Sequence, residues 1–251
     1  MVFITGDCHG DFGKFSTRRF PIQKGMTRDD IVIVCGDFGI WHDSKDERER
    51  LKWLEEKPFT LAFVDGNHEN FDRLYGDEFP VTDFHGGMAH RIRENVFHLM
   101  RGQVFDFEGR SFWCFGGARS HDIQDGILDR DDYESDDAFL AAIREWYAAN
   151  KWFRINHVSW WRQELPTREE MDAGLKALQS RGNEVDYIIS HCCPQEVASA
   201  MGFHESDTLT AYFNEIAHNV RFTRWFFGHY HGEETIFGKF VLLYDTIERV
   251  L

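Results

Sequence analysis

The sequence lacks the features of a secreted, disulfide-bonded or membrane-spanning protein. Its five cysteines form no Cys-x-x-Cys pair, and a chain of 251 residues needs no disulfide to support its core. Its longest apolar runs are far shorter than the roughly 20 residues that span a bilayer. The first residues contain neither the basic segment nor the apolar core of a signal peptide. We therefore expect a cytoplasmic protein with reduced thiols.

The sequence also lacks an excess of positive charge. It has 28 Lys and Arg against 43 Asp and Glu, a formal net charge of −15, which disfavours capture of a nucleic-acid backbone. The aromatic fraction is high at 16%, and stacking on nucleobases would need a basic groove beside it. We therefore expect a core rich in phenylalanine and no strong binding of nucleic acid.

Short apolar runs that recur along the chain predict buried strands at residues 2–5, 31–34, 61–64, 187–190 and 225–227. Continuous runs of this kind fit strands covered on both faces. Between the early runs, residues 47–56 read as a helix that Asp43 or Ser44 caps and that ends before Pro58. Alternation of strand, helix and strand favours βαβ units.

The middle of the chain has a different pattern. Segments 88–92, 96–100, 103–107 and 111–115, with a hairpin turn at Glu108-Gly109-Arg110, predict a partly antiparallel second sheet. Residues 122–156 read as an acidic insertion that continues as a helix at about 137–150. A capping box at Thr167–Glu170 predicts a helix to about residue 180, and residues 234–237 and 240–244 predict a closing hairpin. We expect one α/β domain over residues 1–251, with two sheets flanked by helices.

Each predicted buried strand is followed by residues that carry oxygen or imidazole donors. They are Gly6-Asp7-Cys8-His9-Gly10, Gly36-Asp37, Gly66-Asn67-His68-Glu69, Ser190-His191 and Gly228-His229-Tyr230-His231. The carboxyl ends of strands in an open α/β sheet form one edge, so these side chains are expected to converge there. The glycines are expected to permit the tight turns that this needs.

Carboxylate, amide and imidazole donors together suit Mn, Fe or Zn. The predicted ligands are Asp7, His9, Asp37, Asn67, His191, His229 and His231. Residues two apart share a face in extended chain, which fits the pairs at 7 and 9 and at 229 and 231. Two ions need one bridging carboxylate, and Asp37 is the candidate. Such a pair can clamp a phosphate and supply a bridging hydroxide for in-line attack.

Other residues near the motifs have competing interpretations. Adjacent Cys192 and Cys193 point to opposite faces of extended chain and would chelate zinc poorly. Arg119, after the Gly-Gly turn of Phe115-Gly116-Gly117-Ala118-Arg119, would either bind a substrate phosphate or pair with Asp122 at the surface. His85 and His121 are expected outside the ligand set.

The five ordered motifs resemble those of the calcineurin-like metallophosphoesterase superfamily, particularly its small bacterial and phage members, from residue 6 to residue 231. The resemblance implies a four-layer αββα sandwich with two mixed sheets. It also implies that one ion is held by Asp7, His9, Asp37 and His231, and the other by Asp37, Asn67, His191 and His229. His68 is then the catalytic residue, which protonates the leaving oxygen or stabilises charge on the phosphate. The candidate substrate-binding residues are Asn67, His68 and Arg119, with the surface pairing of Arg119 still open.

The chain departs from the Ser/Thr protein phosphatases of this superfamily at the second motif. Their Gly-Asp-x-x-Asp-Arg-Gly has an Asp that orients the catalytic His and an Arg that grips phosphate, and Ile40 and Trp41 stand at these positions here. Protein phosphatase activity is therefore disfavoured. The partner of His68 is open between Asp43 and Glu69.

The sequence thus predicts an enzyme that hydrolyses a small phosphomonoester or phosphodiester, such as a nucleotide, with two divalent or trivalent ions, and with Mn best in vitro. Two alternatives are a nuclease that acts on DNA or RNA ends and an inactive scaffold of the same fold. Decay to a scaffold should erode ligands, whereas all seven and His68 are present.

Overall fold

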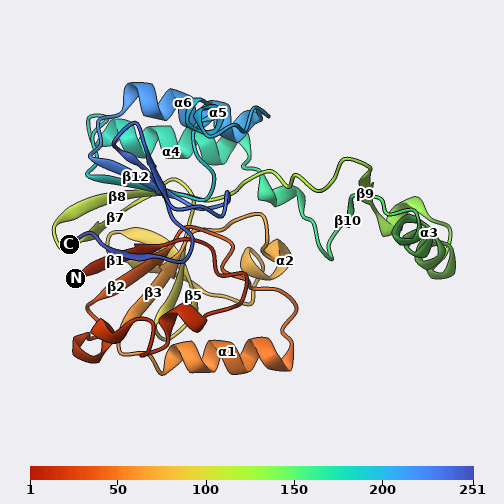
Figure 1. The fold of residues 1–251 in the computed structure, drawn as a ribbon, viewed down its shortest axis with the longest axis horizontal. Coiled ribbons are helices and arrows are strands. Elements are labelled where there is room, and N and C mark those ends of the chain that lie inside the picture. The colour runs from red at the N-terminus through yellow and green to blue at the C-terminus, as the bar shows by residue number, and fades with distance from the viewer.

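The computed structural model describes residues 1–251, and two large β-sheets form its centre (Figure 1). The first has the order β15-β1-β2-β3-β6-β5-β4, in which β1, β2, β3 and β6 are parallel and the outer strands are antiparallel. Its strands are β1 (Val2–Thr5), β2 (Ile31–Val34), β3 (Thr60–Phe63), β4 (Val81–Phe84), β5 (Gly87–Arg93), β6 (Val96–Leu99) and β15 (Ile247–Arg249).

The second sheet has the order β13-β14-β12-β11-β8-β7, and it too has four parallel strands between antiparallel edges. Its strands are β7 (Gln103–Phe107), β8 (Arg110–Phe115), β11 (Tyr187–Ser190), β12 (Arg224–Phe227), β13 (Glu234–Ile236) and β14 (Phe240–Leu242). The helices are α1 (Lys45–Glu55), α2 (Phe71–Leu74), α3 (Asp136–Ala148), α4 (Arg168–Ser180), α5 (Gln195–Ala200) and α6 (Thr208–Asn219).

Three apolar layers lie between these elements, because residues along each central strand alternate between its two faces. In β2, Ile31 and Ile33 face the second sheet, whereas Val32 and Val34 pack with residues of α1. The outer face of the second sheet packs on α4, α5 and α6. The order of layers is helices, sheet, sheet, helices (Figure 1). Burial on both faces explains why the strands are continuous apolar runs, and it confirms the predicted mixed α/β sandwich.

Most predicted boundaries agree with the structure to within two residues. Ser44 rather than Asp43 caps α1, because its side chain accepts a hydrogen bond from the N–H of Glu47. The capping box of Thr167 and Glu170 opens α4 as expected. At the turn between β7 and β8, Glu108 and Gly109 have φ values of 55° and 73°, which is typical of the two-residue hairpin turn.

The assignment of all four middle segments to the second sheet is wrong. β5 and β6 belong to the first sheet, and β7 and β8 belong to the second. The chain crosses between the sheets at Met100–Gly102. Strand periodicity reports which face of a strand is buried, and it carries no information about which sheet the strand joins. The elements β4, β15, α5 and α6 were not predicted from the sequence. The start of α6 has a local signal that could have been used, since Asp207 and Thr210 form a capping box there.

Residues 122–156 extend away from the sheets as an arm, shown in green in Figure 1. The arm contains a two-stranded parallel sheet, β9 (Gly126–Leu128) with β10 (Phe153–Ile155), and the helix α3. None of the residues of α3 is buried. The arm covers the residues for which the sequence predicts an acidic insertion.

A buried ion pair connects the sheets beside their carboxyl edges. Asp65 follows β3, and its carboxylate accepts hydrogen bonds from the guanidinium of Arg101, with Nε at 2.9 Å, and from Nε2 of His98 at 3.1 Å. Its backbone carbonyl accepts from the N–H of Gly117, which follows β8. Burial opposes ionisation of Asp65, but Arg101 and His98 hold its pKa well below the usual range.

We predict that Asp65→Asn destabilises the protein by about 3–5 kcal/mol, because it leaves the Arg101 charge buried without its partner. A depressed carboxyl pKa contributes stability above the unfolded pKa of about 4, and this contribution is lost on acidification. The loss should therefore be full at pH 7 and shrink toward pH 3. Urea unfolding measures it. Glu184→Gln, which breaks an exposed pair with Arg221, is the control and should cost less than about 1 kcal/mol. Equal losses in both variants would contradict this role of Asp65.

Candidate metal centre

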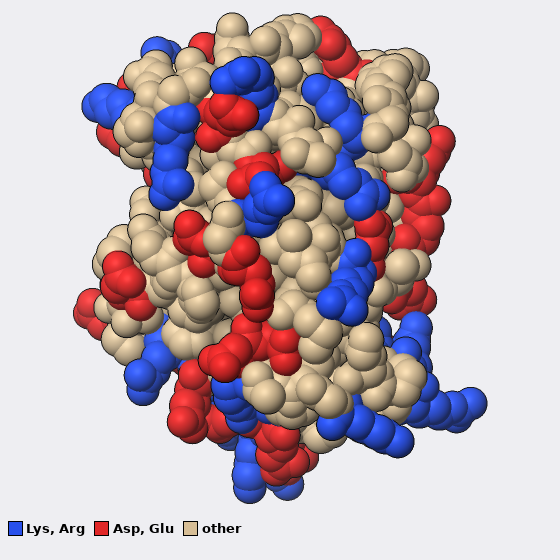
Figure 2. Space-filling model, turned by 90° about the vertical axis from the view of Figure 1, so that its left-hand side faces the viewer, with Lys and Arg blue, Asp and Glu red and all other residues tan.

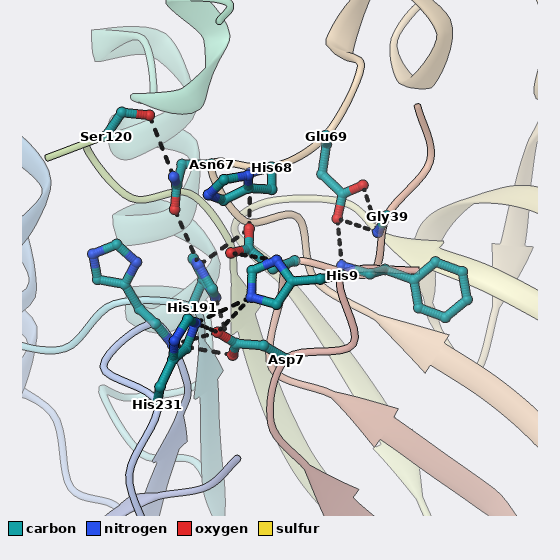
Figure 3. Close-up of polar contacts among 12 residues, drawn as sticks. Asp7, His9, Gly39, Asn67, His68, Glu69, Ser120, His191 and His231 are labelled. Atoms are coloured by element: carbon teal, nitrogen blue, oxygen red, sulfur yellow. Dashed lines mark hydrogen bonds and ion pairs between the residues drawn. The ribbon is translucent and has the colours of Figure 1, made fainter. Parts of the chain in front are cut away.

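The seven predicted ligands lie together where the carboxyl ends of both sheets meet (Figure 3). Asp7 and His9 follow β1, Asp37 follows β2 and Asn67 follows β3 in the first sheet. The second sheet supplies His191 after β11, and His229 and His231 after β12. The centre is therefore assembled from two sheets whose strands end at one edge.

Asp7, His9 and His231 form one convergent group. Nε2 of His9 lies 3.0 Å from Nε2 of His231. The Oδ2 atom of Asp7 is 3.2 Å from Nε2 of His231 and 3.7 Å from Nε2 of His9. Two imidazole nitrogens and one carboxylate oxygen thus face a common point.

A second group forms around His191, which is fully buried. Its Nε2 atom lies 3.3 Å from Oδ1 of Asp37 and 3.3 Å from Oδ1 of Asn67. Oδ2 of Asp37 is 3.7 Å from Nδ1 of His9, so Asp37 stands between the two groups. A third convergent group consists of His9, Asp37 and His68. The ring of His229 packs 5.0 Å from that of His191, centroid to centroid, and belongs to none of the three groups.

The chemistry of this donor set fits a cation. Asp7 and Asp37 are 2% and 1% exposed, and neither forms an ion pair with a lysine or arginine side chain. Burial would lower the pKa of His191, but the carboxylates of Asp37 and Asp7 raise it to about 10. The negative charge is therefore strong enough to hold a positive charge against burial. Carboxylate, amide oxygen and imidazole are ligands of Mn, Fe and Zn.

The glycines beside the ligands serve in two ways. Gly10 and Gly36 have positive φ, as a tight turn requires. Three glycines that directly precede a predicted ligand, Gly36 among them, leave no room for a side chain. A Cβ at any of them would overlap the side chain of another predicted ligand. The overlapping pairs are Gly36 with His191 at 2.2 Å, Gly66 with Asp37 at 2.0 Å and Gly228 with Asp7 at 2.0 Å. The sequence predicted these glycines only from the needs of tight turns, and the structure shows that close packing of ligand side chains also requires them.

Four of the predicted ligands themselves adopt the left-handed backbone conformation. They are His9, Asp37, His229 and His231, with φ of 49°, 46°, 67° and 49°. Residues other than glycine rarely take this conformation, which costs about 1 kcal/mol or more at each position. These turns lie within a few residues of the strand ends, and four of the eleven non-glycine residues with positive φ in the chain are predicted ligands.

Two buried residues with ionisable side chains, Glu69 and Lys14, hold these loops. Glu69 was predicted from the sequence only as a possible partner of His68, and Lys14 was not predicted to have a role. The carboxylate of Glu69 accepts hydrogen bonds from the backbone N–H groups of Phe38 and Ile40 at 2.7 and 2.9 Å, and so fixes the loop that carries Asp37. It also accepts from the N–H of Gly39 at 3.2 Å (Figure 3). Burial, and then the charge of Asp37, raise the pKa of Glu69. Lys14 donates from Nζ to the backbone carbonyl of Asp7 at 2.7 Å and fixes the first motif.

His68 does not contact either of its predicted partners. Asp43 pairs with Arg48, and Glu69 is occupied by backbone N–H groups. Instead, Nε2 of His68 lies 3.2 Å from Nη2 of Arg154, a residue of the arm. The prediction that Asp43 or Glu69 is the partner of His68 is therefore wrong, because the residue that contacts His68 comes from a distant segment.

The ring of His68 lies close to the centre, at 5.1 Å from the ring of His9. Its other ring neighbour is Trp41 at 5.8 Å. Burial, and in smaller part Arg154, lower the pKa of His68 to about 4, although Asp37 opposes this. Burial therefore favours the neutral form of this ring beside the predicted ligands.

Arg119 does not pair with Asp122, because that carboxylate binds Arg154. Arg119 is exposed and lines a cavity of about 490 Å³ whose walls include His229 and His231. The cavity is also lined by His121 and by the exposed ring of Phe203. The structure therefore leaves the guanidinium of Arg119 in a cavity that adjoins the candidate metal centre.

Three further residues weighed from the sequence lie away from the convergent groups. Cys192 and Cys193 are buried in the apolar layer beneath α5 and α6. His85 packs on the rings of Phe84 and Phe107.

A model of the calcineurin-like phosphoesterase family matches residues 1–233, which is most of the chain, and the chain therefore belongs to that family. It is a metal-dependent phosphoric ester hydrolase, with the two mixed sheets and flanking helices of that class. No curated protein matches the chain. None of its helices is long and apolar enough to cross a bilayer.

We predict that Gly66→Ala weakens metal binding by about tenfold or more, because its Cβ would displace the carboxylate of Asp37. Gly25→Ala is the matched control, since a Cβ there meets nothing within 4 Å. Calorimetric titration with Mn²⁺ measures the affinity, and circular dichroism confirms the fold of both variants. Unchanged affinity in a folded Gly66→Ala protein would show that Asp37 does not depend on this close approach.

Proposed function

We propose that the chain hydrolyses a small phosphomonoester or phosphodiester with two metal ions. The observation that carries the proposal is the position of Asp37 between two groups of donors. Asp7, His9, Asp37 and His231 would hold one ion, and Asp37, Asn67, His191 and His229 the other. When bound, such ions polarise the phosphoryl oxygens and activate the attacking water.

The chain's own polar groups would bind and orient the ester. The side-chain nitrogen of Asn67 donates to Ser120 Oγ at 3.3 Å, which keeps its amide oxygen directed toward His191 (Figure 3). Arg119 projects into the adjoining cavity, where its guanidinium would contact a phosphate or another anionic group of the substrate. His68 would donate a hydrogen or a hydrogen bond to the leaving oxygen.

The size of the cavity supports a small substrate. A volume of about 490 Å³ falls within the usual range for small-molecule sites and accommodates a nucleotide. The exposed ring of Phe203 offers a surface for a planar group. We infer a small phosphoester, such as a nucleotide, on these grounds.

A nuclease is the less favoured function. The net charge of −15 weakens long-range attraction for a polyanion. Figure 2 shows the face opposite the arm, and therefore not the face of the candidate site, and basic and acidic side chains are interspersed on it. Five buried, unpaired cysteines favour a cytoplasmic protein.

The main test is a screen of phosphoesters with protein loaded with Mn²⁺. We expect turnover of p-nitrophenyl phosphate or its bis-ester and of small nucleotides. We expect His68→Ala to lose roughly 10²- to 10⁴-fold in kcat, the usual contribution of a general acid. His218→Ala, at an exposed histidine of α6, is the control and should retain full activity. Full activity of His68→Ala would refute the role given to His68. No turnover with Mn, Zn or Fe would favour the inactive scaffold, and preferential cutting of single-stranded oligonucleotides would favour the nuclease.

We also predict that Asp37→Asn lowers the bound metal by both ions, whereas His231→Ala lowers it by one, because Asp37 contacts donors proposed for both ions and His231 contacts donors proposed for one. Metal analysis after dialysis against Mn²⁺ measures the content. An equal loss in both variants would contradict a bridging role for Asp37.

A further inference from the structure

The root of the arm lies against the catalytic centre, although its helix lies far from it (Figure 1). Asp122 stands where the arm begins and Arg154 stands on its returning strand β10. The arm therefore brings a charged pair to His68 from a segment 86 residues away in the sequence.

The guanidinium of Arg154 is almost fully engaged. Nε donates to Oδ1 of Asp122 at 2.8 Å, and Nη2 donates to Oδ2 of Asp122 at 2.8 Å. Nη2 also reaches Nε2 of His68 at 3.2 Å, and Nη1 donates to the carbonyl of Ser159 at 2.9 Å. One N–H of Nε, two of Nη2 and one of Nη1 account for four of the five N–H groups of an arginine. Little capacity is left to grip a phosphate.

The contact with His68 has a defined direction. A guanidinium donates hydrogen bonds and accepts none. Nε2 of His68 must therefore be the acceptor and carry no hydrogen, so the hydrogen of the neutral ring is at Nδ1. The carboxylate of Asp122 pairs with Arg154 and balances its charge, which limits the electrostatic effect of Arg154 on the nearby ligands.

We propose that Arg154, held by Asp122, is a positioning residue that fixes the ring orientation and the tautomer of His68. The inference rests on the proposed role of His68 as a hydrogen-bond donor to the leaving oxygen, because a ring that accepts from Arg154 at Nε2 has only its Nδ1 hydrogen to donate. The arm would then orient His68, which the second motif cannot do here because Ile40 and Trp41 carry no charge.

A second set of contacts holds the root of the arm in place. The carboxylate of Asp72, in the helix α2 that follows the third motif, accepts hydrogen bonds from Nδ1 of His157 at 2.8 Å and from Nε1 of Trp161 at 2.7 Å. The ring of Trp41 lies between His68 and Trp161, at 5.8 and 6.0 Å. The segment that follows the arm is thus anchored to α2 independently of the Arg154 contact, and both sets of contacts hold the root of the arm beside the centre.

The kinetic test compares Arg154→Met with Arg154→Lys. We expect Arg154→Met to lower kcat roughly 10- to 100-fold, as loss of a hydrogen-bond partner of a site histidine does. KM should stay within about twofold, because a positioning residue acts in the transition state and not on substrate binding. Arg154→Lys keeps a donor and should recover part of kcat. Arg130→Met, which breaks an exposed pair with Asp136 in the same arm, should match the parent protein. A large rise in KM at constant kcat would identify a phosphate clamp and overturn the proposal.

The spectroscopic test needs no turnover. ¹⁵N NMR of zinc-loaded protein distinguishes protonated from unprotonated imidazole nitrogens, and the His68→Ala spectrum identifies the signals of His68. We expect an unprotonated Nε2 and a protonated Nδ1 in the parent protein, and loss of this preference in Arg154→Met and partly in Asp122→Asn. A protonated Nε2 in the parent protein would overturn the inference. Absence of activity on every phosphoester would remove the proposed function, while the NMR result would still decide whether Arg154 fixes the tautomer.

Discussion

The carboxylates of Asp7 and Asp37 are buried at the junction of two sheets, and histidines are the only side chains with which they form ion pairs. Desolvation of a carboxylate costs several kcal/mol even after relaxation. The surrounding structure keeps both in this position. Glycines without room for a Cβ, left-handed turns after the strands, and the buried Glu69 all bring them there. Such an arrangement is stable with a cation, so the requirement for metal is built into the fold.

The two sheets divide the centre between them, and their relative position therefore decides whether it exists. The first sheet supplies Asp7, His9, Asp37 and Asn67, and the second supplies the three remaining histidines. The apolar layer between the sheets fixes their spacing. The pair of Asp65 and Arg101 fixes them at the edge where the ligands emerge. Metal binding and folding stability are consequently coupled through the same few contacts.

The arm joins this centre in an unexpected way. Insertions are usually tolerated at the surface because they touch little, and α3 has no buried residue. The root of the arm is different, since it brings the ion pair of Arg154 and Asp122 to His68. Most N–H groups of Arg154 are already engaged, and the two charges balance. A neutral pair can hold an imidazole firmly without competing with cations for the nearby carboxylates. The cavity that Arg119 lines then remains free for substrate.

The sequence by itself determined the features that depend on neighbours in the chain. Apolar runs located the central strands, and donors directly after them located all seven predicted ligands and His68, because a strand end and the next turn are local. Only the tertiary structure decided which sheet β5 and β6 join, why Gly66 and Gly228 are needed, and which residue accompanies His68. Asp43 and Glu69 were candidates because they are close in sequence. Arg154 lies 86 residues from His68, and their contact depends on the packing of the arm against α2, which no local pattern encodes.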